Sequence, residues 1–184
     1  MLSRLRLAQH LLDQSFKVLS DNIATLRLQE ALFIPPGGYL SILGLLKHTA
    51  GWSHVYHSYA FEPQPSHWRE TDWPRGLRDT INPTQDYLDE VIAWLRLSHE
   101  EWMASLRATP ADAIEELRPV HWRAKAPLFE IVVLIANHHT YHAGEINYLL
   151  SMARGEAWEE GEEVDENHIS TLGHRVRPPW LTSD

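Results

Sequence analysis

Residues 137–146 read Asn-His-His-Thr-Tyr-His-Ala-Gly-Glu-Ile, and this stretch carries the strongest structural signal in the chain. His138 and His142 lie four positions apart, so on a helix their rings share one face at about 6 Å. A buried imidazole is costly unless its nitrogens find partners, and a shared cation is such a partner. The two histidines interrupt a set of apolar positions at helical spacing: Ile131, Ile135, Ile146, Leu149 and Ala153. The stretch therefore predicts an amphipathic helix that carries a pair of metal ligands.

Apolar residues recur at the helical period in three further segments, and no segment shows the alternation expected of a strand. We expect Ser41 to be the N-cap of the second helix, and Asn82 with Pro83 to form the cap and first turn of the third. Prolines and glycines at 35–38 separate the first two helices, and Gly155 ends the fourth. The four expected helices lie at about residues 3–31, 41–61, 82–107 and 127–154.

Two long connections, at about residues 62–82 and 108–126, are too long for tight turns between helices. The expected fold is all-α, a four-helix bundle with two long crossover connections rather than a simple up-down meander. Residues 1–154 form this single domain. Residues 155–184 differ, because an acidic run precedes a basic, proline-rich one. We expect this C-terminal tail to pack on the bundle or on a dimer partner, anchored by Trp158 and Trp180.

The second expected helix carries a third histidine at an inward-facing position. His48 lies between Leu45 and Trp52 on the side predicted to face the core. Three histidines from two facing helices leave a fourth coordination position open, which is typical of catalytic rather than structural metal sites. We therefore predict that His48, His138 and His142 bind one divalent metal ion. Imidazole suits zinc, nickel, copper and iron alike, so the spacing does not select among them.

Residues near the predicted ligands have weaker signals. Glu145 lies one turn beyond His142, so it is a candidate either to orient that ligand or to act as a general base. A surface or interhelical carboxylate is the alternative interpretation of Glu145. His139 and Tyr141 lie off the apolar stripe, and we expect them to be packing or boundary residues.

Two other groups of rings are expected to be structural. His54 and His57 face away from His48, which predicts a solvent-facing pair. The tryptophans at positions 52, 94 and 102 follow the helical period, so we expect them in the core. The wall of a hydrophobic substrate site is the alternative for these three tryptophans.

Two familiar metalloenzyme patterns do not fit. A zincin helix needs His-Glu-x-x-His with glutamate as the general base, and His139 occupies the glutamate position. A ferritin-like di-iron bundle needs Glu-x-x-His on two helices, and this motif does not occur in the sequence. Both classes are therefore disfavoured.

Composition narrows the possible functions. The 184 residues carry a net charge of −9, which disfavours a nucleic-acid partner because such proteins present basic patches. The chain has no cysteine, so any thiol chemistry must use an external thiol. No apolar run approaches the length of a membrane helix, and the charged N-terminal stretch lacks a signal-peptide core. We expect a cytoplasmic protein without membrane or nucleic-acid partners.

The stretch at 137–146 resembles the last-helix signature of the DinB/YfiT-like superfamily, often Asn-His-x-x-Tyr-His-Arg-Gly-Gln-Ile. The segment Leu-Leu-Lys-His-Thr-Ala-Gly-Trp at 45–52 is similar to the earlier histidine helix of that family. The resemblance implies a four-helix bundle that commonly forms a homodimer, with a divalent metal, often nickel or zinc, held by His48, His138 and His142. Ala143 and Glu145 stand where relatives often have arginine and glutamine, so the charge around the site differs.

Known relatives include S-transferases and isomerases that use small thiols such as bacillithiol or mycothiol. The resemblance therefore implies a metal-dependent enzyme that acts on a small-molecule substrate, with a low-molecular-weight thiol as co-substrate. A metal-bound hydroxide acting as a hydrolase, with Glu145 as base, is one alternative. A non-catalytic metal-binding protein of the stress response is the other.

Overall fold

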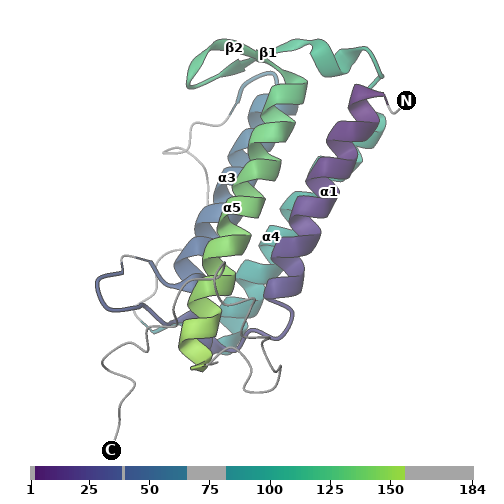
Figure 1. Ribbon diagram of the computed structural model, residues 1–184. Helices are drawn as coiled ribbons and strands as arrows, with labels where there is room; N and C mark the ends of the chain where they lie inside the picture. The colour runs from purple at the N-terminus through teal and green to yellow at the C-terminus, as the bar shows by residue number, and fades with distance from the viewer. Residues whose placement is uncertain (1–2, 39, 66–81, 156–184) are drawn as a thin grey trace, which may run out of the picture.

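The computed structural model describes residues 3–38, 40–65 and 82–155 (Figure 1). Within these ranges the body consists of four long helices: α1 (Arg4–Asn22), α3 (Ile42–Phe61), α4 (Gln85–Ala108) and α5 (Leu128–Arg154). The smaller elements are α2 (Leu28–Ala31), the 3-10 turn η1 (Ala113–Glu115), and the strands β1 (Leu117–Val120) and β2 (Arg123–Pro127). The all-α bundle predicted from the sequence is confirmed, with a small hairpin added at one end.

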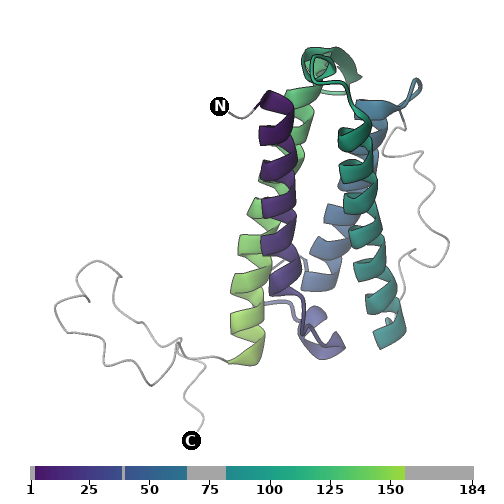
Figure 2. The ribbon, with the colours of Figure 1, turned by 90° about the vertical axis from the view of Figure 1, so that its right-hand side faces the viewer.

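The order of the helices in the bundle explains its two long connections. Helix α1 packs mainly against α5, and α3 packs against both α4 and α5. Helix α3 ends beside β1, whereas α4 begins beside α2 at the opposite end of the bundle (Figures 1 and 2). The two helices therefore run in the same direction, and the connection between them joins opposite ends of the molecule. The link from α4 to α5 crosses the end of the bundle at which α3 and α4 finish, and it contains η1 and the hairpin.

The first helix is shorter than the predicted range of 3–31. Helix α1 ends at Asn22, whose side-chain amide donates a hydrogen bond to the carbonyl oxygen of Ala143 at 2.8 Å. The separate helix α2 then begins after Arg27, whose backbone N–H donates to the Glu30 carboxylate at 2.8 Å. Contacts with α5 and a new cap therefore break a helix that the apolar spacing alone would continue.

The hairpin of β1 and β2 was not predicted, because the range 108–126 reads as irregular. The strands pair antiparallel across a two-residue turn, with a register shift between Pro119 and Val120. Of the strand residues, Val120 and Ala126 alone are buried, so a period-two pattern has no length over which to develop. Such short strands carry too few inward side chains to be recognised from one sequence.

Helix ends follow the predicted capping chemistry with one correction. The Ser41 hydroxyl accepts a hydrogen bond from the backbone N–H of Gly44 at 3.1 Å, and Gly155 ends α5 with a φ of 63°. The third long helix begins later than expected. Thr84, rather than Asn82, is its N-cap, and the Thr84 hydroxyl accepts from the backbone N–H of Tyr87 at 3.2 Å.

The apolar core forms two clusters along the bundle, and the predicted metal ligands lie where these clusters meet. One cluster includes Leu46 and Ile146, and the other includes Val55 and Ile135. Because His48 follows Leu46 on α3, and 138–142 lie between Ile135 and Ile146 on α5, the histidines are placed between two well-packed regions. This packing fixes the backbone on both sides of the site.

Among the described residues, no helix has both the length and the apolar character required to span a membrane. Residues 156–184, with Trp158 and Trp180, lie outside the described ranges. The division into a bundle and a packed C-terminal tail therefore stays a prediction.

Candidate metal centre

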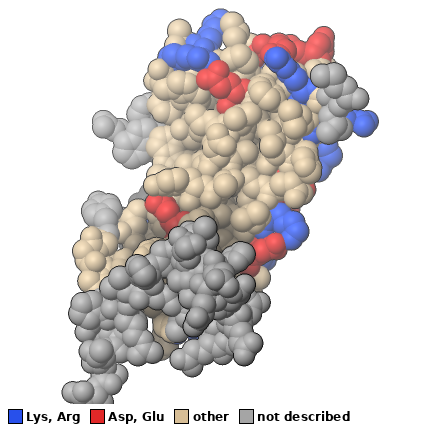
Figure 3. All heavy atoms as spheres, in the orientation of Figure 1, with Lys and Arg blue, Asp and Glu red and all other residues tan. Residues whose placement is uncertain are grey.

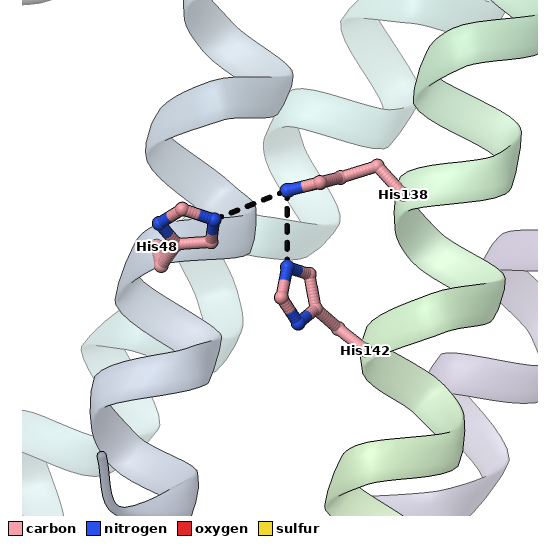
Figure 4. A group of neighbouring side chains, drawn as sticks. All are labelled: His48, His138 and His142. Atoms are coloured by element: carbon pink, nitrogen blue, oxygen red, sulfur yellow. Dashed lines mark hydrogen bonds between the residues drawn. The ribbon is translucent and has the colours of Figure 1, made fainter. Parts of the chain in front are cut away.

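His48 on α3 and His138 and His142 on α5 converge in the space between these two helices (Figure 4). The Nε2 atoms of His48 and His138 are 3.2 Å apart, and those of His138 and His142 are 3.0 Å apart. One ligand nitrogen from each ring lies within 4.8 Å of the others. His142 is buried, whereas His48 and His138 are half-buried. The structure thus brings together the three histidines that the sequence singled out.

The separation of the nitrogens fits a shared cation. Metal–nitrogen bonds of about 2.0–2.1 Å in tetrahedral geometry place ligand nitrogens about 3.3 Å apart. Hydrogen bonds alone satisfy the cluster poorly, because a neutral imidazole has one N–H and one acceptor nitrogen. The Nε2 atom of His138 is shared by two neighbours, and its Nδ1 is buried with no hydrogen-bond partner among the described residues. The donor set therefore suits a divalent metal ion.

Burial keeps the rings of His48 and His138 neutral, which is the protonation state that binds metals. Desolvation is the main cause that lowers the pKa of His48, and the nearby His142 lowers it further. Burial, with the adjacent His142 and His48, lowers the pKa of His138 to about 3. Both rings are consequently neutral near pH 7 and each offers a lone pair.

Glu145 contacts the third ring directly. Its Oε2 atom is 2.6 Å from Nδ1 of His142, and its side chain is 36% exposed. In neutral His142, Nδ1–H donates to this carboxylate and Nε2 keeps its lone pair toward the other histidines. Tyr141 also hydrogen-bonds Glu145, which raises the pKa of the Tyr141 hydroxyl. This contact is the one expected if Glu145 orients the His142 ring. It also engages the carboxylate that would act as the general base in a hydrolase.

His139 and Tyr141 have opposite environments. His139 is fully buried, with its ring edge-on to Phe16 at 5.9 Å between centroids. Neither of its ring nitrogens has a hydrogen-bond partner in the described part of the chain, and burial lowers its pKa to about 3. His139 is therefore a packing residue, as predicted. Tyr141 is 64% exposed on α5, and its ring meets that of His142 edge-on at 5.1 Å between centroids, so of the two expectations it fits a boundary residue and not a core packing residue.

The prediction of a solvent-facing pair at His54 and His57 is wrong. Both side chains are half-buried, because α4 packs against this face of α3. His57 lies with Nε2 at 2.9 Å from the Ser105 hydroxyl on α4. The His54 ring lies 6.4 Å from the ring of Trp94. These histidines join two helices and are not directed toward the metal centre.

The three tryptophans divide into two groups. Trp94 and Trp102 are buried in the core, and the indole N–H of Trp102 donates to the carbonyl oxygen of Ser53 at 2.9 Å. Trp52 is only half-buried, and its ring centroid lies 6.3 Å from that of His48. The core prediction therefore holds for two of them, while Trp52 lies beside the candidate metal centre.

Two notable histidines were missed by the sequence analysis. His99 is buried on α4 and stacks on Phe16, with centroids 3.9 Å apart. It follows Leu95 by four positions, so the helical period of α4 would have placed it inward. His121 lies in the hairpin turn among aromatic rings. No sequence signal marks it, because the hairpin itself was not predicted.

A bundle with parallel neighbours α3 and α4, and three histidines converging between α3 and α5, defines a DinB-like protein. The family model for mycothiol-S-transferase matches residues 7–155. The chain belongs to this family, which is part of the DinB/YfiT-like metalloenzyme superfamily. The matched range includes all three histidines of the candidate centre. Family membership implies thiol S-transfer in a metal-dependent bundle.

Comparison with solved structures supports the same fold. A crystal structure of a conserved protein from Enterococcus faecalis is similar, with a TM-score of 0.61 and 17% sequence identity. The similarity covers 85% of this chain and 100% of the other. At this identity it establishes the fold and no more. A search of curated proteins found no match.

Proposed function

We propose that this protein is a metal-dependent S-transferase that uses a low-molecular-weight thiol. His48, His138 and His142 are the proposed ligands of one divalent ion, with zinc or nickel as the first candidates. The observation that carries this proposal is the convergence of three imidazole nitrogens at a spacing that suits one cation. The Nε2 atom of His138 lies 3.2 Å from that of His48 and 3.0 Å from that of His142. Family membership supports thiol transfer as the reaction class.

The chemistry follows from what such a site supplies. A bound divalent ion lowers the pKa of a thiol beside it and so favours the thiolate. The thiolate sulfur forms a bond to an electrophilic carbon, and the leaving group departs with its bonding pair. Because the chain contains no cysteine, the sulfur comes from a small molecule. The family description makes mycothiol the first thiol to test.

The chain's own residues hold the site ready for this reaction. Burial keeps His48 and His138 neutral. The carboxylate of Glu145 fixes the orientation of His142 through the 2.6 Å contact with Nδ1. We assign Glu145 a positioning role, which favours S-transfer over the hydrolase alternative because hydrolysis would need this carboxylate as a base.

Rate measurements on matched variants test the proposal. Zinc-loaded and nickel-loaded protein is incubated with mycothiol or bacillithiol and a model electrophile, and thioether formation is followed. We expect turnover by the native protein and by His10→Ala, a control that removes an exposed histidine on α1. We expect no turnover above background for His142→Ala. Equal rates for the native protein and His142→Ala would refute the transferase assignment.

Two further variants, together with His142→Ala, address the two alternatives. A hydrolase predicts cleavage of esters, amides or lactones that is lost in Glu145→Gln. A non-catalytic metal-binding protein predicts that His48→Ala lowers the melting temperature while no substrate is turned over. Thiol-dependent turnover that disappears in His142→Ala contradicts both alternatives.

The homodimer implied by the family resemblance is also a proposal. The outer face of α1 and α5 carries few charged side chains in its middle, and Lys, Arg, Asp and Glu gather toward its ends and edge (Figure 3). Large apolar side chains are exposed on these helices: Leu7, Leu11 and Val18 on α1, and Tyr141 and Tyr148 on α5. We propose this face as the contact between two copies. Dependence on a small thiol also favours the cytoplasm as the location.

A further inference from the structure

Aromatic rings extend from the candidate metal centre along one face of α3. The ring centroids of His48 and Trp52 are 6.3 Å apart, in an edge-to-face arrangement. Trp52 stacks on Tyr56, with centroids 5.2 Å apart and planes 29° from parallel. The three residues follow one another at intervals of four, so they lie on one face of the helix. The rings therefore form a continuous row that begins at a proposed metal ligand.

The β1–β2 hairpin closes the far end of this row. The His121 ring in the hairpin turn lies 5.7 Å from Trp52 and 5.9 Å from Tyr56. The Trp122 ring meets Tyr56 edge-on at 5.7 Å and His121 at 5.0 Å. We call Trp52, Tyr56, His121 and Trp122 the aromatic column. Two segments that are distant in the sequence thus build one aromatic surface.

The members of the aromatic column differ in exposure. Tyr56 is buried, and burial raises the pKa of its hydroxyl, so the ring is uncharged at neutral pH. Trp52 and Trp122 are half-buried, while His121 is exposed. Trp52 is therefore only partly covered, and its ring centroid lies 6.3 Å from that of His48. An accessible indole at this place is suited to contact a bound molecule.

Both arginines of the hairpin pair with carboxylates, while its third basic residue, Lys125, is exposed. Arg118 lies 2.9 Å from the Glu116 carboxylate, and Arg123 pairs with Glu130. Each guanidinium is therefore already engaged by a neighbouring carboxylate. The surroundings suit an uncharged, planar group that interacts through its ring face.

We propose that the aromatic column binds the electrophilic co-substrate through an uncharged aromatic ring, with Trp52 as the main contact. The ring is held beside His48, so the electrophilic carbon attached to it lies near the thiol. This proposal rests on the proposed S-transferase function and adds the class of the second substrate. Trp52 determines specificity, while the three histidines would hold the metal ion that favours the thiolate.

A matched pair of electrophiles tests this preference. N-Phenylmaleimide and N-cyclohexylmaleimide share one reactive double bond and differ in whether the attached ring is aromatic. The thiolate sulfur bonds to one alkene carbon, the π electron pair moves to the neighbouring carbonyl, and solvent supplies a proton to the other carbon. The protein has no cysteine of its own for the maleimides to alkylate.

Binding is measured first, with the unreactive analogues N-phenylsuccinimide and N-cyclohexylsuccinimide and the metal-loaded full chain. We expect the phenyl compound to bind about 2- to 12-fold more tightly, the range that one aromatic pair contributes. Trp52→Leu, which keeps apolar volume without an aromatic face, should remove this difference. Trp52→Phe should restore most of it, and Tyr148→Leu should leave it unchanged because Tyr148 is exposed on α5. Equal affinity of the native protein for both analogues would overturn the proposal.

Turnover is measured second, as kcat and KM for each maleimide relative to its uncatalysed rate. We expect a preference for the phenyl compound that resides in KM and is lost in Trp52→Leu. A preference that survives in Trp52→Leu contradicts the assigned role. Absence of turnover with both maleimides, together with selective binding of the phenyl succinimide, contradicts the S-transferase function but supports the aromatic column as a binding site.

Discussion

Replacement of Glu145 tests how the site is held together. Its carboxylate lies 2.6 Å from Nδ1 of His142, and Tyr141 hydrogen-bonds the same carboxylate. Loss of such an outer partner of a metal-bound histidine typically lowers metal affinity about 10- to 100-fold, or about 1.4–2.7 kcal/mol. We therefore expect Glu145→Ala to weaken zinc or nickel binding by this amount. Glu145→Gln keeps an acceptor oxygen without the charge, so its loss should be less than about tenfold.

The assay is competition with a chromogenic chelator at constant pH, with the dissociation constant determined for each variant. Glu101→Gln on α4 is the control, because it removes an exposed carboxylate from a helix that supplies none of the three proposed ligands. We expect its affinity to equal that of the native protein. If Glu145→Ala binds metal as tightly as the native protein does, the carboxylate does not hold His142 for a metal, and the reasoning about this contact is incorrect.

Three further predictions concern stability and assembly. Arg154 and Arg27 hold the pKa of Glu30 at about 2, below the ordinary 4.5, so this carboxylate should stabilise the fold by about 2 kcal/mol above pH 4.5, after allowance for screening at exposed Arg27. The stabilisation should disappear as the pH falls from about 4.5 to 2. Denaturant unfolding of the native protein and of Glu30→Gln at several pH values checks this. A difference in unfolding free energy between the two proteins that does not change with pH would contradict it. His139→Leu should raise the free energy of unfolding by about 1–2 kcal/mol, since both ring nitrogens of His139 are buried without partners in the described structure; a loss of stability in urea unfolding would argue against this. Val18→Glu should convert a dimer into a monomer in analytical ultracentrifugation, because Val18 is 51% exposed on the proposed contact face; an unchanged dimer would exclude that face.

The sequence allowed the convergence of the three histidines to be predicted because two independent patterns agreed. Helical spacing placed His138 and His142 on one face, and the same period turned His48 inward on another helix. Helix boundaries at Ser41 and Gly155 were also predictable, since capping chemistry is local. These features depend on residues close together in the chain, so one sequence is enough to recognise them.

Features set by distant contacts were not predictable in the same way. The break after Asn22 depends on its hydrogen bond to Ala143, which lies on another helix. The hairpin leaves too few buried positions for a strand pattern to emerge. His57 was expected in solvent because the helical period does not say which neighbour covers that face of α3. The aromatic column was missed for the same reason, since it joins Trp52 to a turn about 70 residues further along.

Anomalous X-ray diffraction from crystals of the protein as purified, without added metal, tests the central claim most directly. The account predicts one strong anomalous peak at about 2.0–2.1 Å from Nε2 of His48, His138 and His142, with an absorption edge that identifies the element. A density map with no peak among these three rings, or with a metal bound only elsewhere on the chain, would contradict it.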